Sequence, residues 1–129
     1  NSLPFPDLVP KLIEISTGIT HPIVLSDDSK EIFGRMPVEN EMMHPFIFSV
    51  LAHKIAQGAD KKGLLEDFQY ISRKQFFIRK KGNDFIIQNL SQNGTIVDGK
   101  NLKNNESIIL TNKAKITFGK DFTCSFNIN

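Results

Sequence analysis

The sequence predicts an all-β fold, an antiparallel β-sandwich with a short helical or irregular insertion between residues 36 and 69. Short apolar or β-branched runs recur along the chain with turn residues between them, which is typical of such sandwiches. The pair Asp98-Gly99 is a strong hairpin signal. No glycine-rich loop leads from a strand into a helix, which disfavours nucleotide-binding α/β folds.

Length and composition restrict the function further. The 129 residues are expected to form one domain, and 16 Lys+Arg against 14 Asp+Glu give a net charge of +2, which excludes binding of polyanions through bulk charge. No apolar run approaches the roughly 18 residues of a membrane span. The single cysteine, Cys124, cannot form an intrachain disulfide, which favours a cytosolic or nuclear setting. The 11 phenylalanines predict a Phe-rich core rather than a ligand-stacking surface.

The first part of the chain predicts an arm followed by short strands. Pro4 and Pro6 deny residues 1–10 the hydrogen bonds of a sheet, so we expect an extended N-terminal arm there and a single domain over residues 11–129. Short strands are expected at residues 12–16, 23–25 and 31–35.

The second part predicts the rest of the sandwich as a series of hairpins. Residues 80–83 form a basic, glycine-containing connection between two strands, and Asp98-Gly99 suits a two-residue turn because both positions favour positive φ. The expected strands cover residues 71–79, 84–90, 95–97, 101–102, 107–110, 115–118 and 123–128.

The insertion, at about residues 40–68, breaks this rhythm. Pro45 can open a helix at its first position, Ile47, Leu51 and Ile55 then share one stripe, and Gly58 is placed to end it. The alternative is that residues 46–50, which are aromatic and β-branched, form a strand of the sandwich. Residues 60–63 are expected to be an exposed loop.

No residue pattern indicates an enzyme, a metal site or a cofactor. In a helix, His44 and His53 would be nine positions apart and point in different directions, and we expect the three histidines, His21 included, to be surface or loop residues. Ser49 lacks the Gly-x-Ser-x-Gly context of a nucleophile. The basic stretch 79–81 fits a solvated hairpin tip better than a contact with nucleic acid.

Three polar motifs stand at the ends of expected strands: Gly34-Arg35, residues 72–75 (Ser-Arg-Lys-Gln) and residues 89–95 (Asn-Leu-Ser-Gln-Asn-Gly-Thr). Arginine offers a planar fork of donors, serine a hydroxyl and asparagine an amide, and a loop glycine lets backbone amides face a ligand. Together they suit an oxyanion carried on a peptide. A chance arrangement of turns is the alternative.

In their order and context these motifs resemble the forkhead-associated (FHA) domain, a β-sandwich that binds phosphothreonine peptides. The Asp98-Gly99 hairpin and the strand Ile116-Thr117-Phe118-Gly119 continue the pattern, and the resemblance covers roughly residues 31–128. It implies a non-catalytic module that recruits a phosphothreonine-containing partner in signalling. The parent protein could be an enzyme such as a protein kinase. A nuclear or cytoplasmic location follows, with the nucleus favoured by the resemblance alone.

The resemblance also implies roles for individual residues. Arg35 and Ser72 would bind the phosphate, and Arg73 would make a further contact with the phosphate or the peptide backbone. Asn93 would hold the peptide main chain, with Gln92 beside it in the variable loop. Tyr70 falls where the family reads the side chain three positions after the phosphothreonine. The expected loop-shaping residues are Gly34, Gln75, Gly94 and Thr95.

The sequence departs from the family pattern at three places. Gln75 replaces a buried histidine that supports the binding loops, and because glutamine also offers a donor and an acceptor, it can serve the same role. Lys113-Ala114 stands where a Gly-Asp turn is common, away from the phosphate site. Arg35 and Ser72 are 37 positions apart, about twice the usual spacing, so some 20 residues are inserted. This insertion either pads the core or supplies a second contact surface; the latter favours an alternative function, a phosphate-independent scaffold or oligomerisation domain.

Overall fold

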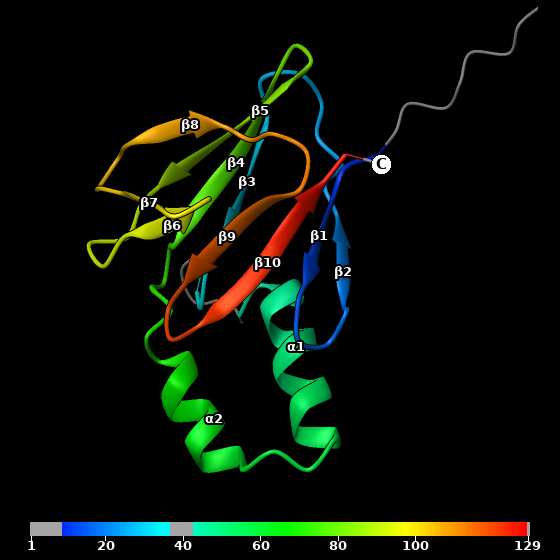
Figure 1. The fold of residues 1–129 in the computed structure, drawn as a ribbon, viewed down its shortest axis with the longest axis vertical. Coiled ribbons are helices and arrows are strands. Elements are labelled where there is room, and N and C mark those ends of the chain that lie inside the picture. The colour runs from blue at the N-terminus through cyan, green and yellow to red at the C-terminus, as the bar shows by residue number, and fades with distance from the viewer. Residues whose placement is uncertain (1–8, 37–42, 129) are drawn as a thin grey trace, which may run out of the picture.

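The computed structural model of the protein describes residues 9–36 and 43–128 and contains two antiparallel sheets packed face to face (Figure 1). The larger sheet has the strand order β2-β1-β10-β9-β6-β7. Its strands are β1 (Lys11–Glu14), β2 (Thr20–Pro22), β6 (Thr95–Val97), β7 (Lys100–Leu102), β9 (Ala114–Phe118) and β10 (Phe122–Asn127). The smaller sheet has the order β3-β4-β5-β8. Its strands are β3 (Lys30–Phe33), β4 (Phe76–Lys81), β5 (Asp84–Asn89) and β8 (Ser107–Ile109). The predicted β-sandwich is confirmed.

Along several strands, every second side chain is buried, and these side chains face the core. In β10 the side chains of Phe122, Cys124 and Phe126 are buried, and the residues between them lie on the outer side. The Phe-rich core is confirmed for the described residues, since most of their phenylalanine rings are buried, while Phe85 is half-buried and Phe48 is 46% exposed. These buried rings are Phe33, Phe46, Phe68, Phe76, Phe77, Phe118, Phe122 and Phe126.

The β6–β7 hairpin turns as its sequence predicts. Asp98 has φ 49° and Gly99 has φ 83°, so both turn residues lie in the left-handed region. This is the geometry whose twist matches that of two paired strands. The Asp98 carboxylate also accepts a hydrogen bond from the Lys115 amide at 2.9 Å, which fixes the hairpin against β9.

The insertion contains two helices, α1 (Pro45–Ala56) and α2 (Lys61–Phe68). Pro45 occupies the first turn of α1, and Ile47 and Leu51 are buried, so the helix prediction is confirmed and the alternative strand at 46–50 is wrong. The loop expected at 60–63 is also wrong. The Asp60 carboxylate accepts the Gly63 amide at 3.0 Å and caps α2, an N-cap that stabilises a helix start even in a polar segment.

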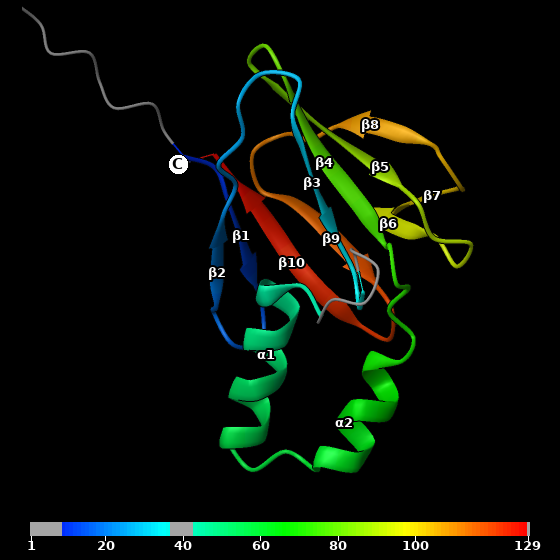
Figure 2. The same cartoon turned by 180° about the vertical axis from the view of Figure 1, so that it is seen from behind.

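Figures 1 and 2 both show α1 and α2 side by side at one end of the sandwich. The rings of Phe46 in α1 and Phe68 in α2 pack edge-on against Phe122 of β10, with centroids 5.9 and 6.0 Å apart. The insertion therefore extends the core, as the padding interpretation expects. With 12 and 8 residues, neither helix in the described ranges is long enough to cross a bilayer.

Two of the strand predictions are wrong. The strand expected at 23–25 is β2 (Thr20–Pro22), which pairs with β1 through His21 and Leu12. The strand expected at 71–79 begins at Phe76, so Ser72 lies in the preceding loop. The reason is local, because the amide of Ser72 donates to the Gln75 side chain instead of to a neighbouring strand. Residues 1–8 of the expected arm and residues 37–42 of the insertion lie outside the described residues.

Candidate functional site

The three polar motifs lie close together because three adjacent strands of the smaller sheet start or end at the same end of that sheet. Phe33 at the end of β3 pairs with Phe76 at the start of β4, which pairs with Asn89 at the end of β5. The segments that follow or precede these residues therefore leave the sheet side by side. Helix α2 is connected to this same end of the sandwich (Figure 1).

An open depression of about 530 Å³ lies between these segments. All six residues predicted to bind a phosphopeptide line it, together with four neighbours. The lining consists of Arg35, Gln69, Tyr70, Ile71, Ser72, Arg73, Leu90, Ser91, Gln92 and Asn93. Among the residues that the structure describes, this lining includes two arginines and no carboxylate, so its charge favours an anionic ligand.

Arg35 is half-buried and held from two sides. Its amide donates to the Ser72 carbonyl at 3.0 Å, and its Nε donates to the Ile71 carbonyl at 3.1 Å. The bond at Nε fixes the plane of the guanidinium, and no residue that the structure describes accepts a hydrogen bond from its terminal nitrogens. Ile71 is itself 1% exposed and belongs to the core, so it anchors this arginine to the body of the domain.

Gly34 allows the close approach of the two loops. A Cβ atom at this position would lie 2.0 Å from the carbonyl oxygen of Arg73, which is main chain and cannot rotate away. The amide of Met36 donates to that same oxygen at 3.0 Å. Only glycine fits here, which supports the loop-shaping role predicted for Gly34.

The buried side chain of Gln75 connects the loop that carries Ser72 to the loop that carries Asn93. Its side chain is 1% exposed, and its oxygen accepts the Ser72 amide at 2.9 Å. Its nitrogen donates to the Gly94 carbonyl at 2.9 Å and to the Thr95 hydroxyl at 3.0 Å. All the polar atoms of this buried amide are thus used in supporting the loops, as expected for a substitute of the family histidine.

Asn89 and Ser91, for which the sequence predicted no role, complete the support of the loops. The Asn89 side-chain oxygen accepts the Thr95 hydroxyl at 2.7 Å and the Ser91 amide at 3.0 Å, while its nitrogen donates to the carbonyls of Ser91 and Leu102. An Asn side chain that accepts the amide hydrogen two positions later forms a known type of turn. Asn89 before Ser91 is therefore the sequence signal that could have indicated this support. Gly94, with φ +86°, packs against the side chain of Asn101.

The remaining predicted residues are exposed around the rim. Arg73, Gln92 and Asn93 present their side chains to solvent, and Tyr70 is 58% exposed. The ammonium of Lys120 lies 5.7 Å from the centre of the Tyr70 ring, which restricts the ring from one side. These side chains are therefore free to contact a peptide lying across the depression.

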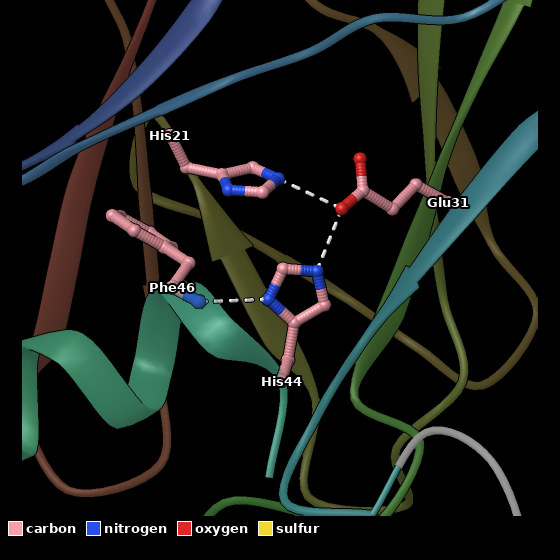
Figure 3. A network of polar contacts seen from close by, with 4 residues as sticks. All are labelled: His21, Glu31, His44 and Phe46. Carbon is pink, nitrogen blue, oxygen red and sulfur yellow. Dashed lines mark hydrogen bonds and ion pairs between the residues drawn. The ribbon is translucent and has the colours of Figure 1, made fainter.

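A second polar cluster joins His21 of β2, Glu31 of β3 and His44 before α1 (Figure 3). The Nε2 atoms of His21 and His44 lie 2.8 and 2.7 Å from the same oxygen of Glu31. His21 is half-buried in β2, so the expectation of a surface or loop residue is wrong for it, whereas His44 lies in the loop before α1 but is buried there. Burial alone would raise the pKa of Glu31, but the hydrogen bonds from both histidines outweigh it and lower the pKa to about 2.

These three side chains have the composition of a metal site, and their potential ligand atoms lie within 4.8 Å of one another. The helix cap argues against that role. The Nδ1 of His44 accepts the Phe46 amide at 3.0 Å, so the proton of the neutral ring is on Nε2 (Figure 3). A metal at Nε2 would move that proton to Nδ1, where it would face the Phe46 N–H. The cluster is a hydrogen-bonded clamp between β2, β3 and α1.

The comparisons with known proteins agree with this geometry. The model of the FHA domain family matches residues 59–119. No curated protein matches the chain by sequence.

Several solved structures share the fold. The N-terminal FHA domain of RAD53P from S. cerevisiae, solved with a phosphothreonine peptide, is 18% identical and has a TM-score of 0.65, with 94% of each chain covered. The FHA domain of an Arabidopsis thaliana hypothetical protein is 18% identical with a TM-score of 0.63, covering 99% of this chain and 94% of that one. The FHA domain of CT664 from Chlamydia trachomatis is 21% identical with a TM-score of 0.58, covering 92% and 96%. The partial family match and the solved structures together show that this chain has the β-sandwich fold of forkhead-associated domains.

Proposed function

We propose that this domain binds phosphothreonine in a partner protein and recruits that partner in signalling, without catalysing a reaction itself. One observation carries the proposal: Arg35, Ser72, Arg73 and Asn93, from three separate chain segments, line the same depression, and no carboxylate within residues 9–36 and 43–128 lines it. The structure of RAD53P, an FHA domain of the same fold, contains a phosphothreonine peptide, which supports the assignment.

The chemistry of the depression suits a phosphate. A phosphothreonine carries about −1.5 to −2 charges and three strong acceptor oxygens. Arg35 offers the terminal nitrogens of its guanidinium and Ser72 a hydroxyl, so both supply donors. Hydrogen bonds to charged groups contribute roughly 1.5–3 kcal/mol each, so two or three are enough for specific binding of modest affinity.

The exposed rim suits the peptide around the phosphate. Asn93 can form paired hydrogen bonds with a peptide main chain because its side chain offers both a donor and an acceptor. In this proposal Gln92 touches the ligand beside Asn93, Arg73 makes a second contact to the phosphate or the peptide backbone, and Tyr70 reads a side chain after the phosphothreonine.

A degenerate phosphothreonine peptide library, screened against the purified domain, tests the proposal and identifies the preferred sequence. We expect selection of phosphothreonine peptides over their unphosphorylated and phosphoserine counterparts. Equal capture of all three classes would reject the proposal. In that case, self-association of the unmodified protein in sedimentation experiments would favour a scaffold or oligomerisation domain.

We further propose a nuclear or cytoplasmic location, with the nucleus favoured by family resemblance, and a parent protein that uses the domain for recruitment. Fluorescence microscopy of the tagged full-length protein tests the location, and accumulation in any other compartment would contradict it.

A further inference from the structure

We infer that Ser91 is a positioning residue that orients the Ser72 hydroxyl so that its proton points to the bound phosphate. This inference rests on the proposed function for its consequence, but the orientation itself can be tested without a ligand. Both serines line the depression, but Ser91 is only 2% exposed whereas Ser72 is half-buried.

The two hydroxyls form a short hydrogen bond whose direction the distances alone leave open. The Oγ atoms of Ser72 and Ser91 lie 2.6 Å apart, and either could be the donor. The Oγ of Ser91 also lies 3.0 Å from the amide nitrogen of Asn93. Because a backbone N–H can only donate, Ser91 is the acceptor of this second bond.

The number of hydroxyl protons determines which of the two serines donates the hydrogen bond. A serine hydroxyl has one proton to donate. If Ser72 donated to Ser91, the Ser91 proton would be buried without an acceptor among the residues that the structure describes, and buried polar groups are rarely left in that state. Ser91 therefore donates to Ser72. The proton of Ser72 then has no acceptor within residues 9–36 and 43–128 and is available to an anion in the depression.

The main chain around Ser72 holds this arrangement in place. Its amide donates to the Gln75 side chain at 2.9 Å, and its carbonyl accepts the Arg35 amide at 3.0 Å. The donors thus form one series, from the Asn93 amide to Ser91, from Ser91 to Ser72, and from Ser72 to the ligand. Consecutive hydrogen bonds that point the same way polarise one another, so the last donor of the series is strengthened.

This arrangement favours a ligand acceptor at Ser72, because its free proton can be donated only to an acceptor. In this inference Ser91 contributes to the recognition of an anion by directing that proton. Its effect acts through Ser72.

Proton NMR of the unliganded protein tests the orientation. We expect a slowly exchanging hydroxyl proton on Ser91 and a rapidly exchanging one on Ser72, with Ser91→Ala removing the slow signal and the exchange protection of the Asn93 amide. A slow signal that belongs to Ser72, or no slow hydroxyl signal at all, would overturn the inference. This result is independent of what the protein binds.

A double-mutant cycle on phosphothreonine-peptide affinity tests the consequence. Ser91→Ala should weaken binding about tenfold when Ser72 is present, and less than about threefold in the Ser72→Ala background. Equal weakening in both backgrounds would mean that Ser91 only supports the loop, which would overturn the positioning role. A wild-type protein that binds phosphorylated and unphosphorylated peptides equally would reject the proposed function while the NMR result still decides the orientation.

Discussion

The side-chain nitrogen of Gln75 donates to the main-chain oxygen of Gly94 at 2.9 Å, which joins two loops whose residues are 19 positions apart. The oxygen of the same side chain accepts the Ser72 amide. A single buried amide therefore sets the distance between the loop that carries Ser72 and the loop that carries Asn93. The width of the depression between them depends on this residue.

Removing that amide is expected to destabilise the domain. Gln75→Leu leaves the Ser72 amide, the Gly94 carbonyl and the Thr95 hydroxyl without this partner, which should lower the free energy of unfolding by about 2–4 kcal/mol. Urea denaturation measures the change. The matched control is Gln88→Leu on β5, whose half-buried side chain should tolerate the change within about 1 kcal/mol.

Restoring a polar group should recover part of that loss. Gln75→His offers one donor and one acceptor, so we expect its stability to lie between those of the wild type and Gln75→Leu. If the histidine variant were as unstable as the leucine variant, the support of the two loops by this side chain would be in question.

Gly34 should not tolerate a side chain. The Cβ of Gly34→Ala would lie 2.0 Å from the Arg73 carbonyl, so the two loops must separate, at a cost of about 1–3 kcal/mol in stability. Peptide affinity should fall with it, because Arg35 moves away from Ser72. Gly18→Ala is the control for a glycine in open space, with only the cost of its φ of +75°. Thermal unfolding and a binding titration measure both effects, and equal behaviour of the two variants would contradict the steric account.

The planar pair of donors of the Arg35 guanidinium should contribute more to phosphopeptide affinity than its positive charge. Arg35→Lys keeps the charge but loses the planar donor pair and the bond to the Ile71 carbonyl, so phosphopeptide binding should weaken roughly tenfold or more. Arg35→Ala should weaken binding roughly 100-fold. Lys81→Ala removes the same charge at the other end of β4 and should leave affinity within about twofold at physiological salt. Full affinity in Arg35→Lys would show that only charge is recognised.

Glu31 should make stability depend on pH in the acid range. Its pKa is lowered from an ordinary 4.5 to about 2 in the folded protein, so its stabilising contribution is present above pH 4.5 and is lost as the pH falls from 4.5 towards 2. Because the side chain is one-quarter exposed, we expect a contribution of about 2 kcal/mol rather than the full value of the shift. Denaturation of wild type and Glu31→Gln between pH 7 and 3 measures it. The two curves should converge in acid, and a constant difference would contradict the clamp.

Much of the sandwich could be predicted because its signals are local. The Asp98-Gly99 turn predicted the β6–β7 hairpin, and the short run at residues 123–128 predicted the strand that corresponds to β10. Both depend only on residues that are neighbours in sequence. The six residues predicted to bind the peptide could be brought to one depression because their motifs stand at the ends of adjacent strands.

The errors arise where distant residues decide the structure. His21 and His44 look like surface residues until β2, β3 and the start of α1 come together around Glu31. Helix α2 was missed because its first residues are polar and include Gly63, and its stability comes from the Asp60 cap and from Phe68 packing on Phe122. These contacts join segments that are far apart in the chain.

The role of Ser91 within the site also depends on residues that are distant in the sequence. Its contact with Ser72 joins residues 19 positions apart, and its role follows from a count of protons that needs the positions of both hydroxyls and the Asn93 amide. The sequence placed Ser91 in the motif but offered no reason to separate it from its neighbours.

The most direct test of the account is the affinity of the wild-type domain for one threonine peptide, measured by calorimetry with and without phosphate on that threonine. The peptide is the sequence preferred in the library screen. We predict that phosphorylation strengthens binding by roughly 100-fold or more, since two or three charge-assisted hydrogen bonds are gained. Equal affinity for the two forms would contradict the assignment of Arg35, Ser72 and Asn93 to a phosphothreonine site.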